Sequence, residues 1–501
     1  MTTRKAQGNE SLSSPTGISG LDDILRGGLP RNRLYLVEGD PGVGKTTFAL
    51  QFLLAGASRG ESALYITLSE TKAELESVAK SHDWSLDGIV LYELSAMNAR
   101  LQAGDSTFFH PSELELNQTT QAILDKVDEV NPQLVVFDSL SELRLLSETP
   151  LRYRRMILSF KQHFSKRQST VLLLDDRSTE ANDPHVRSLA HGVLLLEKLA
   201  PEYGVTRRRM RIEKVRGLKF REGNHDFVIE TGRMEFFPRL IAAEHHVNFP
   251  QQTLSSGIRD LDSLLGGGLD FGTSTIVMGP AGTGKSTLAM QYAISAAKRG
   301  QKSAFFLFDE GLGSLLVRAK SIGMDLERYY RSGDIHLQQV DPADIAPGEL
   351  VHKVRHLVEQ REIKLVGLDS LNGYFHAMPG EKYLQLQLHE LFVYLNQRGL
   401  VTIAIMAQHG LLGPMQSQFD LSYLADTVLL LRFFEAGGEV KQAISILKKR
   451  TGRHERTIRE FKIESRGLRV GGPLHEFHGI LTGTPTFTGA SRRIMKGTKS
   501  R

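Results

Sequence analysis

Two glycine-rich segments contain the residues whose chemistry is easiest to recognise. Residues 39–46 read GDPGVGKT and residues 279–286 read GPAGTGKS. Glycines let backbone N–H groups curl around phosphate oxygens, and the start of a following helix favours anions. The pattern therefore predicts two sites for the phosphates of ATP. The residues expected to line them are Gly39, Gly42, Gly44, Lys45, Thr46 and Thr47 in the first site and Gly279, Gly282, Gly284, Lys285, Ser286 and Thr287 in the second.

A magnesium ion is expected beside each set of phosphates. The lysine of each motif would reach the β- and γ-phosphates, and the hydroxyl residue after it, Thr46 or Ser286, would bind Mg²⁺. The metal also needs a carboxylate at the tip of a neighbouring strand. Asp138 and Asp369 end the apolar runs QLVVFD and KLVGLD, and the recurrence of this arrangement predicts that both bind Mg²⁺. The alternative is that each aspartate only caps a helix.

Hydrolysis also needs a group that orients or deprotonates the attacking water. Glu70 and Glu310 follow the second apolar run of each half, where a catalytic carboxylate is expected, and Asp309 directly precedes Glu310. These three are the candidate catalytic residues. The alternative interpretation is that they are acidic residues at the start of a helix, where the helix dipole stabilises them.

A basic pair stands near the end of each half of the chain, Lys214 with Arg216 and Lys448 with Arg450. Alternation along a strand places both cations of a pair on one face. That face could supply positive charge to the γ-phosphate held by a neighbouring subunit. The alternative is an edge strand whose charges only prevent aggregation.

The elements that must position these residues follow from an internal repeat. Residues 16–29 read TGISGLDDILRGGL and residues 256–269 read SGIRDLDSLLGGGL, an offset of 240 residues that also relates the two motif lysines. In each copy, apolar runs such as LYLVEG and STIVMG alternate with helical patterns. Such runs predict buried parallel strands. The expected fold is α/β, with two tandem RecA-like P-loop domains, each a mostly parallel sheet flanked by helices.

The repeat also sets the expected domain boundaries. A segment with two prolines and no helical period precedes the second copy, and the chain ends in a polar, basic stretch. We expect a flexible segment at 1–12, a first domain at 13–240, a linker at 241–252, a second domain at 253–482 and a basic tail at 483–501.

Composition excludes several classes of protein. The chain has no cysteine, which excludes disulfides, thiolate zinc ligands and cysteine nucleophiles. The net charge of +5 over 501 residues does not favour nucleic-acid binding. No signal-like segment and no run of about 18 apolar residues occurs. We therefore expect a cytoplasmic protein that crosses no membrane.

Beyond these motifs, the chain resembles the circadian-clock KaiC family over nearly its whole length. The resemblance rests on the duplication, on the GI..LD..L.GGL pattern before each P-loop, on the basic pairs and on the segment HERTIREF at 454–461. It implies a double-ring homo-hexamer with ATP at the subunit interfaces, and clock or signalling proteins as partners. It adds His454 to the ATP-binding residues. It also implies that the second domain acts as an autokinase on Ser422.

Some residues depart from the family's pattern. The family has paired glutamates where this chain has Ser69-Glu70 and Asp309-Glu310, so the first glutamate is missing from both copies. Glu70 and Glu310 would then have to replace it, or Asp309 would act as a shorter base. The family's Ser-Thr phosphorylation pair aligns with Ser422-Tyr423, which argues against a two-site phosphorylation cycle.

Two other functions remain open from the sequence. One is a nucleotide-switched signalling scaffold with little turnover, which the missing glutamates favour. The other is a DNA-dependent ATPase of the RecA type, against which the small net charge argues.

Overall fold

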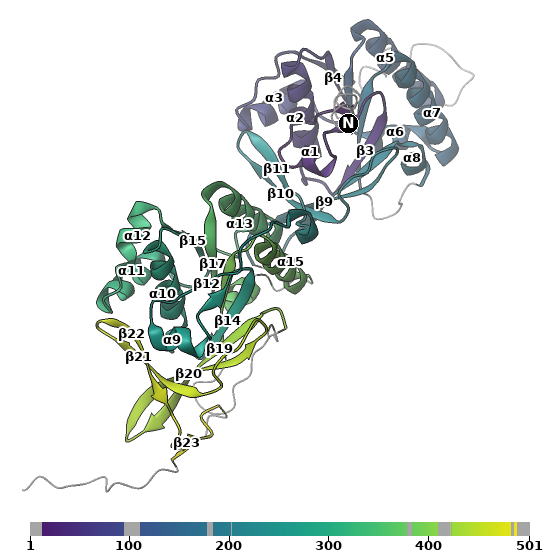
Figure 1. Ribbon diagram of the computed structural model, residues 1–501. Coiled ribbons are helices and arrows are strands. Elements are labelled where there is room, and N and C mark those ends of the chain that lie inside the picture. The colour runs from purple at the N-terminus through teal and green to yellow at the C-terminus, as the bar shows by residue number, and fades with distance from the viewer. Residues whose placement is uncertain are drawn as a thin grey trace, which may run out of the picture. The chain divides into compact units, whose positions relative to one another are not determined.

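The chain divides after Arg239 into two compact units, each built on one large sheet (Figure 1). The computed structural model describes residues 13–94, 111–177, 184–201, 203–376, 378, 383–408, 421, 423–481 and 485–487. We describe the two units, here called the first and second domains, separately.

The first domain contains a nine-stranded sheet with the order β11-β10-β9-β8-β3-β7-β6-β4-β5. The strands from β8 to β5 in this order run parallel, and β9, β10 and β11 continue the sheet in antiparallel fashion. Their bounds are β3 Leu34–Gly39, β4 Ala63–Thr67, β5 Ile89–Glu93, β6 Leu134–Asp138, β7 Thr170–Asp176, β8 Gly192–Leu199, β9 Arg207–Val215, β10 Asn224–Glu230 and β11 Arg233–Phe237.

The second domain repeats this arrangement. Its nine-stranded sheet has the order β16-β15-β17-β18-β14-β19-β20-β21-β22, parallel from β16 to β19 and antiparallel beyond. The bounds are β14 Thr273–Gly279, β15 Lys302–Leu307, β16 Ile335–Gln339, β17 Ile363–Asp369, β18 Val401–Ala407, β19 Thr427–Ala436, β20 Glu439–Lys449, β21 Ile458–Glu464 and β22 Gly467–Pro473. The predicted α/β class with two mostly parallel sheets is confirmed.

Helices cover both faces of each sheet. In the first domain these are α1 Leu21–Ile24, α2 Lys45–Ser58, α3 Lys72–Ser81, α5 Pro111–Val130, α6 Leu140–Ser147, α7 Pro150–Arg167 and α8 Pro184–Leu189. In the second domain they are η2 Ala242–His245, α9 Arg259–Leu264, α10 Lys285–Ala297, α11 Leu312–Ser321, α12 Leu326–Ser332, α13 Pro347–Arg361, α14 Leu371–His376 and α15 Leu384–Gln397. Short two-stranded pairings complete the structure: β1 Ser13–Ser14 with β2 Leu29–Pro30, β12 Thr253–Leu254 with β13 Leu269–Asp270, and β23 Phe477–His478 with β24 Thr486–Phe487.

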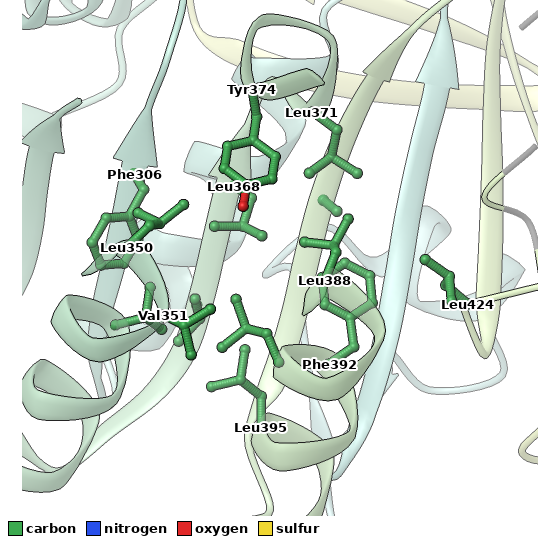
Figure 2. Close-up of a cluster of buried hydrophobic side chains, with 14 of the residues drawn as sticks. Phe306, Leu350, Val351, Leu368, Leu371, Tyr374, Leu388, Phe392, Leu395 and Leu424 are labelled. Atoms are coloured by element: carbon green, nitrogen blue, oxygen red, sulfur yellow. The ribbon is translucent and has the colours of Figure 1, made fainter. Parts of the chain in front are cut away.

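The central strands are mostly apolar because helices bury both faces of the sheet. Each domain consequently has a large hydrophobic cluster on either side of its sheet, and the second domain has a further small cluster around Phe434, Ala443 and Ile480. Figure 2 shows part of the cluster between the second sheet and its covering helices α13, α14 and α15, with the labelled residues Phe306, Leu350, Val351, Leu368, Leu371, Tyr374, Leu388, Phe392, Leu395 and Leu424.

The segment after Arg239 packs on the second domain. Leu240 and Ala242 are buried in the cluster of Figure 2, and the Val247 N–H donates to the carbonyl of Gln397 at the end of α15. The Phe249 ring lies where a Cβ on Gly272 or Gly399 would be, 2.3–2.4 Å from that position. These two glycines therefore make room for the aromatic ring.

The signature before each P-loop is tied to the helix that follows the loop. Asp22 accepts hydrogen bonds from the Thr16 N–H at 2.8 Å and the Thr16 hydroxyl at 2.7 Å, and Asp262 accepts the same pair from Ser256. Gln51 of α2 donates to the Gly17 carbonyl. Gln291 of α10 likewise donates to the Ser256 carbonyl, so the repeated segment anchors the start of each domain on the helix that follows its P-loop.

Candidate nucleotide-binding sites

Both P-loops connect a buried strand to a helix, as the motif requires. The first lies between β3 and α2 and the second between β14 and α10, and the motif lysine is the first residue of each helix. Gly44 and Gly284 have φ of 111° and 92°, which side-chain-bearing residues rarely adopt. A Cβ at either position would also lie 2.4 or 2.5 Å from the Cδ1 atom of Ile229 or Ile463. Only glycine fits at both places.

The lysine of the first site is held by its own loop and by a carboxylate. Lys45 Nζ donates to the carbonyl oxygens of Gly39 at 2.9 Å and Asp40 at 3.2 Å. It also donates to Asp176 Oδ1 at 2.7 Å. Asp176 ends β7 and lies opposite Gly39 in the parallel register. The phosphate-binding cation therefore has an anionic partner within its own domain.

Among the described residues, no carboxylate forms an ion pair with the lysine of the second site. Lys285 Nζ donates to the Pro280 carbonyl at 2.7 Å. In this sheet Ala407 stands opposite Gly279, where the first sheet has Asp176. Burial lowers the pKa of Lys285 to about 8, against which only the charge of Asp369 acts. An anion at this position, such as a phosphate, would restore the ordinary pKa.

The hydroxyl residue and the aspartate expected to bind magnesium meet in the first site. Thr46 Oγ1 donates to Asp138 Oδ2 at 3.0 Å, and the same oxygen accepts the Tyr65 hydroxyl at 2.5 Å. Burial raises the pKa of Asp138, while these hydrogen bonds and Lys45 oppose the shift.

The corresponding aspartate of the second site is less well satisfied. Asp369 accepts a hydrogen bond from Ser286, but its Oδ2 atom is buried without a partner among the described residues. Burial raises its pKa to about 6. The Asp369 carboxylate and the Ser286 hydroxyl together offer two hard oxygen ligands, and no described cation contacts the free carboxylate oxygen. These residues therefore fit a magnesium ion.

Glu70, the candidate catalytic residue of the first site, follows β4. Its backbone is fixed by Thr67, whose hydroxyl donates to the Glu70 carbonyl and accepts from the Glu70 N–H. Its side-chain Oε2 atom is buried without a hydrogen-bond partner among the described residues. Burial, with the nearby charges of Asp138 and Glu74, raises the pKa of Glu70. A carboxylate with a raised pKa and a free oxygen is suited to accept a proton.

The two acidic residues of the second site are both engaged. Asp309 Oδ2 accepts the Ser370 hydroxyl at 2.5 Å. Glu310 forms a two-pronged pair with Arg318, at 3.1 Å from Nε to Oε1 and 2.6 Å from Nη2 to Oε2. The two sites thus share their phosphate-binding parts and differ in the state of their candidate bases.

The basic pairs lie at the other edge of the sheet from the P-loop of the same domain. Val215, between Lys214 and Arg216, pairs with Gly192, which pairs with Tyr35 near the start of β3, whereas the P-loop begins at the end of β3. Both cations donate to adjacent carbonyls, those of Arg187 and Ser188. The structure therefore does not bring this pair to its own P-loop.

The second domain repeats this placement. Lys448 donates to the Ala425 carbonyl and Arg450 to the Tyr423 carbonyl, at the start of β19. His454 follows β20, and its backbone N lies 4.0 Å from where a Cβ on Gly266 would be. All three residues are thus remote from the P-loop of their own domain. Ser422 lies outside the described residues, and Tyr423 beside it is exposed.

Three residues of these sites were not predicted from the sequence: Tyr65, Asp176 and Arg318. Tyr65 and Asp176 lie on strands whose apolar character was their only obvious feature. The repeat does contain a signal for Arg318, because the offset of 240 residues places it opposite Val78. A comparison of the two copies position by position would have singled it out.

Two domains, each with a P-loop at the carboxyl end of a buried parallel strand and an aspartate on a second strand of the sheet, define a tandem P-loop ATPase of the RecA type. Comparison with known families identifies the family. The KaiC ATPase model matches residues 14–240 and again 254–475, and the chain belongs to this family.

Individual relatives cover most of the chain. The circadian clock oscillator protein KaiC of Acaryochloris marina is 25% identical over 94% of this chain and 91% of its own length. That of Thermostichus vulcanus is 26% identical over the same shares. The circadian clock protein KaiC3 of a Synechocystis species is 24% identical over 98% of this chain and 97% of its own length. In the described part of the chain, no helix combines the length and apolar character needed to cross a membrane.

Proposed function

We propose that both domains bind Mg-ATP and that the first hydrolyses it. The observation that carries this proposal is the convergence, at the end of β3, of Lys45, the Thr46–Asp138 pair and the partly buried Glu70. Lys45 would hold the β- and γ-phosphates after leaving Asp176. Thr46 and Asp138 would hold Mg²⁺, which neutralises phosphate charge.

Glu70 then has a defined role. The oxygen of a water molecule attacks the γ-phosphorus, the bond to the β,γ-bridging oxygen breaks, and ADP and phosphate result. Glu70 orients the water and takes its proton. Steady-state phosphate release at saturating Mg-ATP tests the proposal. Release that falls to background in Glu70→Gln supports it, and a wild-type chain that binds ATP without releasing phosphate would refute it.

We further propose a double-ring homo-hexamer with nucleotide between subunits. Its support is the position of the basic pairs, which lie away from the P-loop of their own domain; a nucleotide that they contact would therefore be one held by another chain. The number six comes from the family resemblance. Light scattering with and without Mg-ATP tests this; a monomer at saturating nucleotide contradicts it.

Phosphorylation of Ser422 by the second domain is the third part of the proposal. Lys285, Ser286 and Asp369 would hold Mg-ATP, and Asp309 or Glu310 would assist the serine hydroxyl. Incubation with γ-labelled ATP followed by mapping of the label is the test. Absence of label on Ser422, while ATP is hydrolysed, would leave an ATPase without this kinase activity.

We also propose a signalling role in the cytoplasm with clock or other regulatory proteins as partners; the names of the relatives, which are circadian clock proteins, support the clock context. One observation favours a second candidate, a nucleotide-switched scaffold with little turnover, for the second domain. There both candidate bases already have hydrogen-bond donors, Asp309 from Ser370 and Glu310 from Arg318.

A further inference from the structure

Arg318 joins the candidate base of the second site to the helix that follows the P-loop. It lies on α11, and its guanidinium donates from Nε and Nη2 to the two oxygens of Glu310. Its remaining nitrogen, Nη1, donates to Thr287 Oγ1 on α10 at 2.7 Å. One side chain thus links the residue expected to take a proton with the second residue after the phosphate-binding Lys285.

The first domain has the same parts without this link. The offset of 240 residues relates Glu310 to Glu70, Thr287 to Thr47 and Arg318 to Val78. Val78 is an apolar residue packed against the cluster that contains α2 and α3. Glu70, in consequence, has one oxygen buried without a partner. Arg318 is therefore the difference between the two candidate bases.

The chemistry of the guanidinium explains what the link does. A two-pronged contact engages both carboxylate oxygens in charge-assisted hydrogen bonds, so a water molecule must compete with the guanidinium for them. It also fixes the orientation of the side chain toward Arg318 instead of toward a water. The pair is partly exposed, with 36% of the Arg318 and 28% of the Glu310 side chain accessible. The contact can consequently be removed by substitution without opening the core.

We propose that Arg318 is a positioning residue that withholds Glu310 from an attacking water, so that the second site hydrolyses ATP more slowly than the first. This inference rests on the proposed function, in which both sites bind Mg-ATP. By this inference, one arginine causes the two domains to hydrolyse ATP at different rates. In the first domain Val78 stands at the equivalent position and leaves Glu70 free to contact a water.

The test exchanges the two residues in the full-length chain. In a Glu70→Gln background, which silences the first site, Arg318→Val should raise phosphate release from the second site by about tenfold or more, within the range that a positioned base contributes. The change should be in kcat and not in KM. Adding Glu310→Gln to this double variant should return the rate to that of Glu70→Gln alone.

The reciprocal exchange tests the first site. In a Glu310→Gln background, Val78→Arg should lower phosphate release, because the new arginine can reach Glu70 as Arg318 reaches Glu310. The Arg318→Val variant also needs a control for the loss of a positive charge from α11. Lys320→Val removes an exposed lysine from that helix and should change the rate of neither site. ATP occupancy and the unfolding midpoint of each variant show whether it is folded and loaded.

Each outcome decides the inference. An unchanged or lower rate in loaded Glu70→Gln/Arg318→Val overturns it, and so does a gain that survives Glu310→Gln. If Arg318→Val does not fold, the Val78→Arg arm still decides, because it removes no contact of the second domain; an unchanged first-site rate there overturns the inference. Failure of the proposed function is distinguishable, since the wild-type chain would then bind ATP without releasing phosphate.

Discussion

Lys45 and Asp176 form an ion pair of 2.7 Å in the first site, so a nucleotide phosphate must compete with Asp176 for this ammonium group. The second site has Ala407 at the same register position, and no described carboxylate forms an ion pair with Lys285 there. Because Asp176 is partly exposed, the pair is worth about 0.5–1 kcal/mol.

Replacing Asp176 by the residue of the second domain should consequently tighten nucleotide binding. Asp176→Ala should lower the Kd of the first site by roughly two- to fivefold, and by more where the carboxylate also repels the phosphates. Calorimetric titration with a non-hydrolysable ATP analogue, in a Lys285→Ala background, isolates this site. An unchanged or weaker affinity would show that the ion pair does not oppose binding.

The two motif lysines should act independently. Lys45→Ala and Lys285→Ala should each abolish nucleotide at one site only, because each ammonium contacts the loop of its own domain. Quantifying the nucleotide released from denatured protein gives the occupancy per chain. Full occupancy of both sites in both variants would refute the assignment of the P-loops.

Gly373 allows Asp309 to occupy its present position. A Cβ on Gly373 would lie 2.1 Å from Asp309 Oδ1, so Gly373→Ala must displace that carboxylate and break its contact with Ser370. Label transfer to Ser422 should fall by about tenfold or more, as expected when a reacting group is displaced by about 1 Å. Gly313→Ala is the matched control, since no atom lies within 4 Å of its added Cβ. Equal label transfer in the two variants would remove Asp309 from the reaction.

The stability of the first domain should depend on pH through His225. This buried ring donates from Nε2 to the Arg221 carbonyl and accepts the Arg239 N–H at Nδ1, so a second ring proton would face another donor. Burial, with the charges of those two arginines, lowers the pKa of His225 from 6.5 to about 4. The unfolded chain binds the proton first, so stability present above pH 6.5 is lost as pH falls toward 4.

The expected loss is about 3 kcal/mol, from about 1.4 kcal/mol for each pKa unit. Denaturant unfolding followed by the fluorescence of Trp84, the chain's single tryptophan, reports the first domain. His191, whose pKa burial also lowers to about 4, contributes to the same window. The difference between the wild type and His225→Gln isolates His225, and equal pH slopes would contradict its role.

The sequence predicted the parts of the sites that depend on local spacing. The P-loop residues from Gly39 to Thr47 belong to one strand, turn and helix, so their types alone define the geometry. Asp138 could be predicted because the apolar strand that ends in this aspartate recurs in the second copy. The α/β fold followed from the same recurrence of apolar runs.

What the sequence did not reveal are contacts between distant segments. Asp176 meets Lys45 only because β7 lies beside β3 in the sheet, an order that adjacency in sequence does not predict. Arg318 reaches Glu310 from α11, so this contact can be predicted only when the position of that helix relative to Glu310 is known. The antiparallel extension formed by β9, β10 and β11 likewise depends on pairing that follows the parallel sheet.

Each P-loop and the basic pair of the same domain lie at opposite ends of the strands of the sheet. The domain therefore presents its nucleotide-binding residues at one end and its cations at the other. In the proposed ring, such subunits would join head to tail, an arrangement that closes when the rotation permits. Loss of the P-loop lysine and loss of the basic pair can then be tested in separate chains. If the ring forms as proposed, a chain lacking Lys45 and a chain lacking Arg216 should each be inactive alone at the first site. When mixed, the two should complement, because the intact loop of one would meet the intact cations of the other.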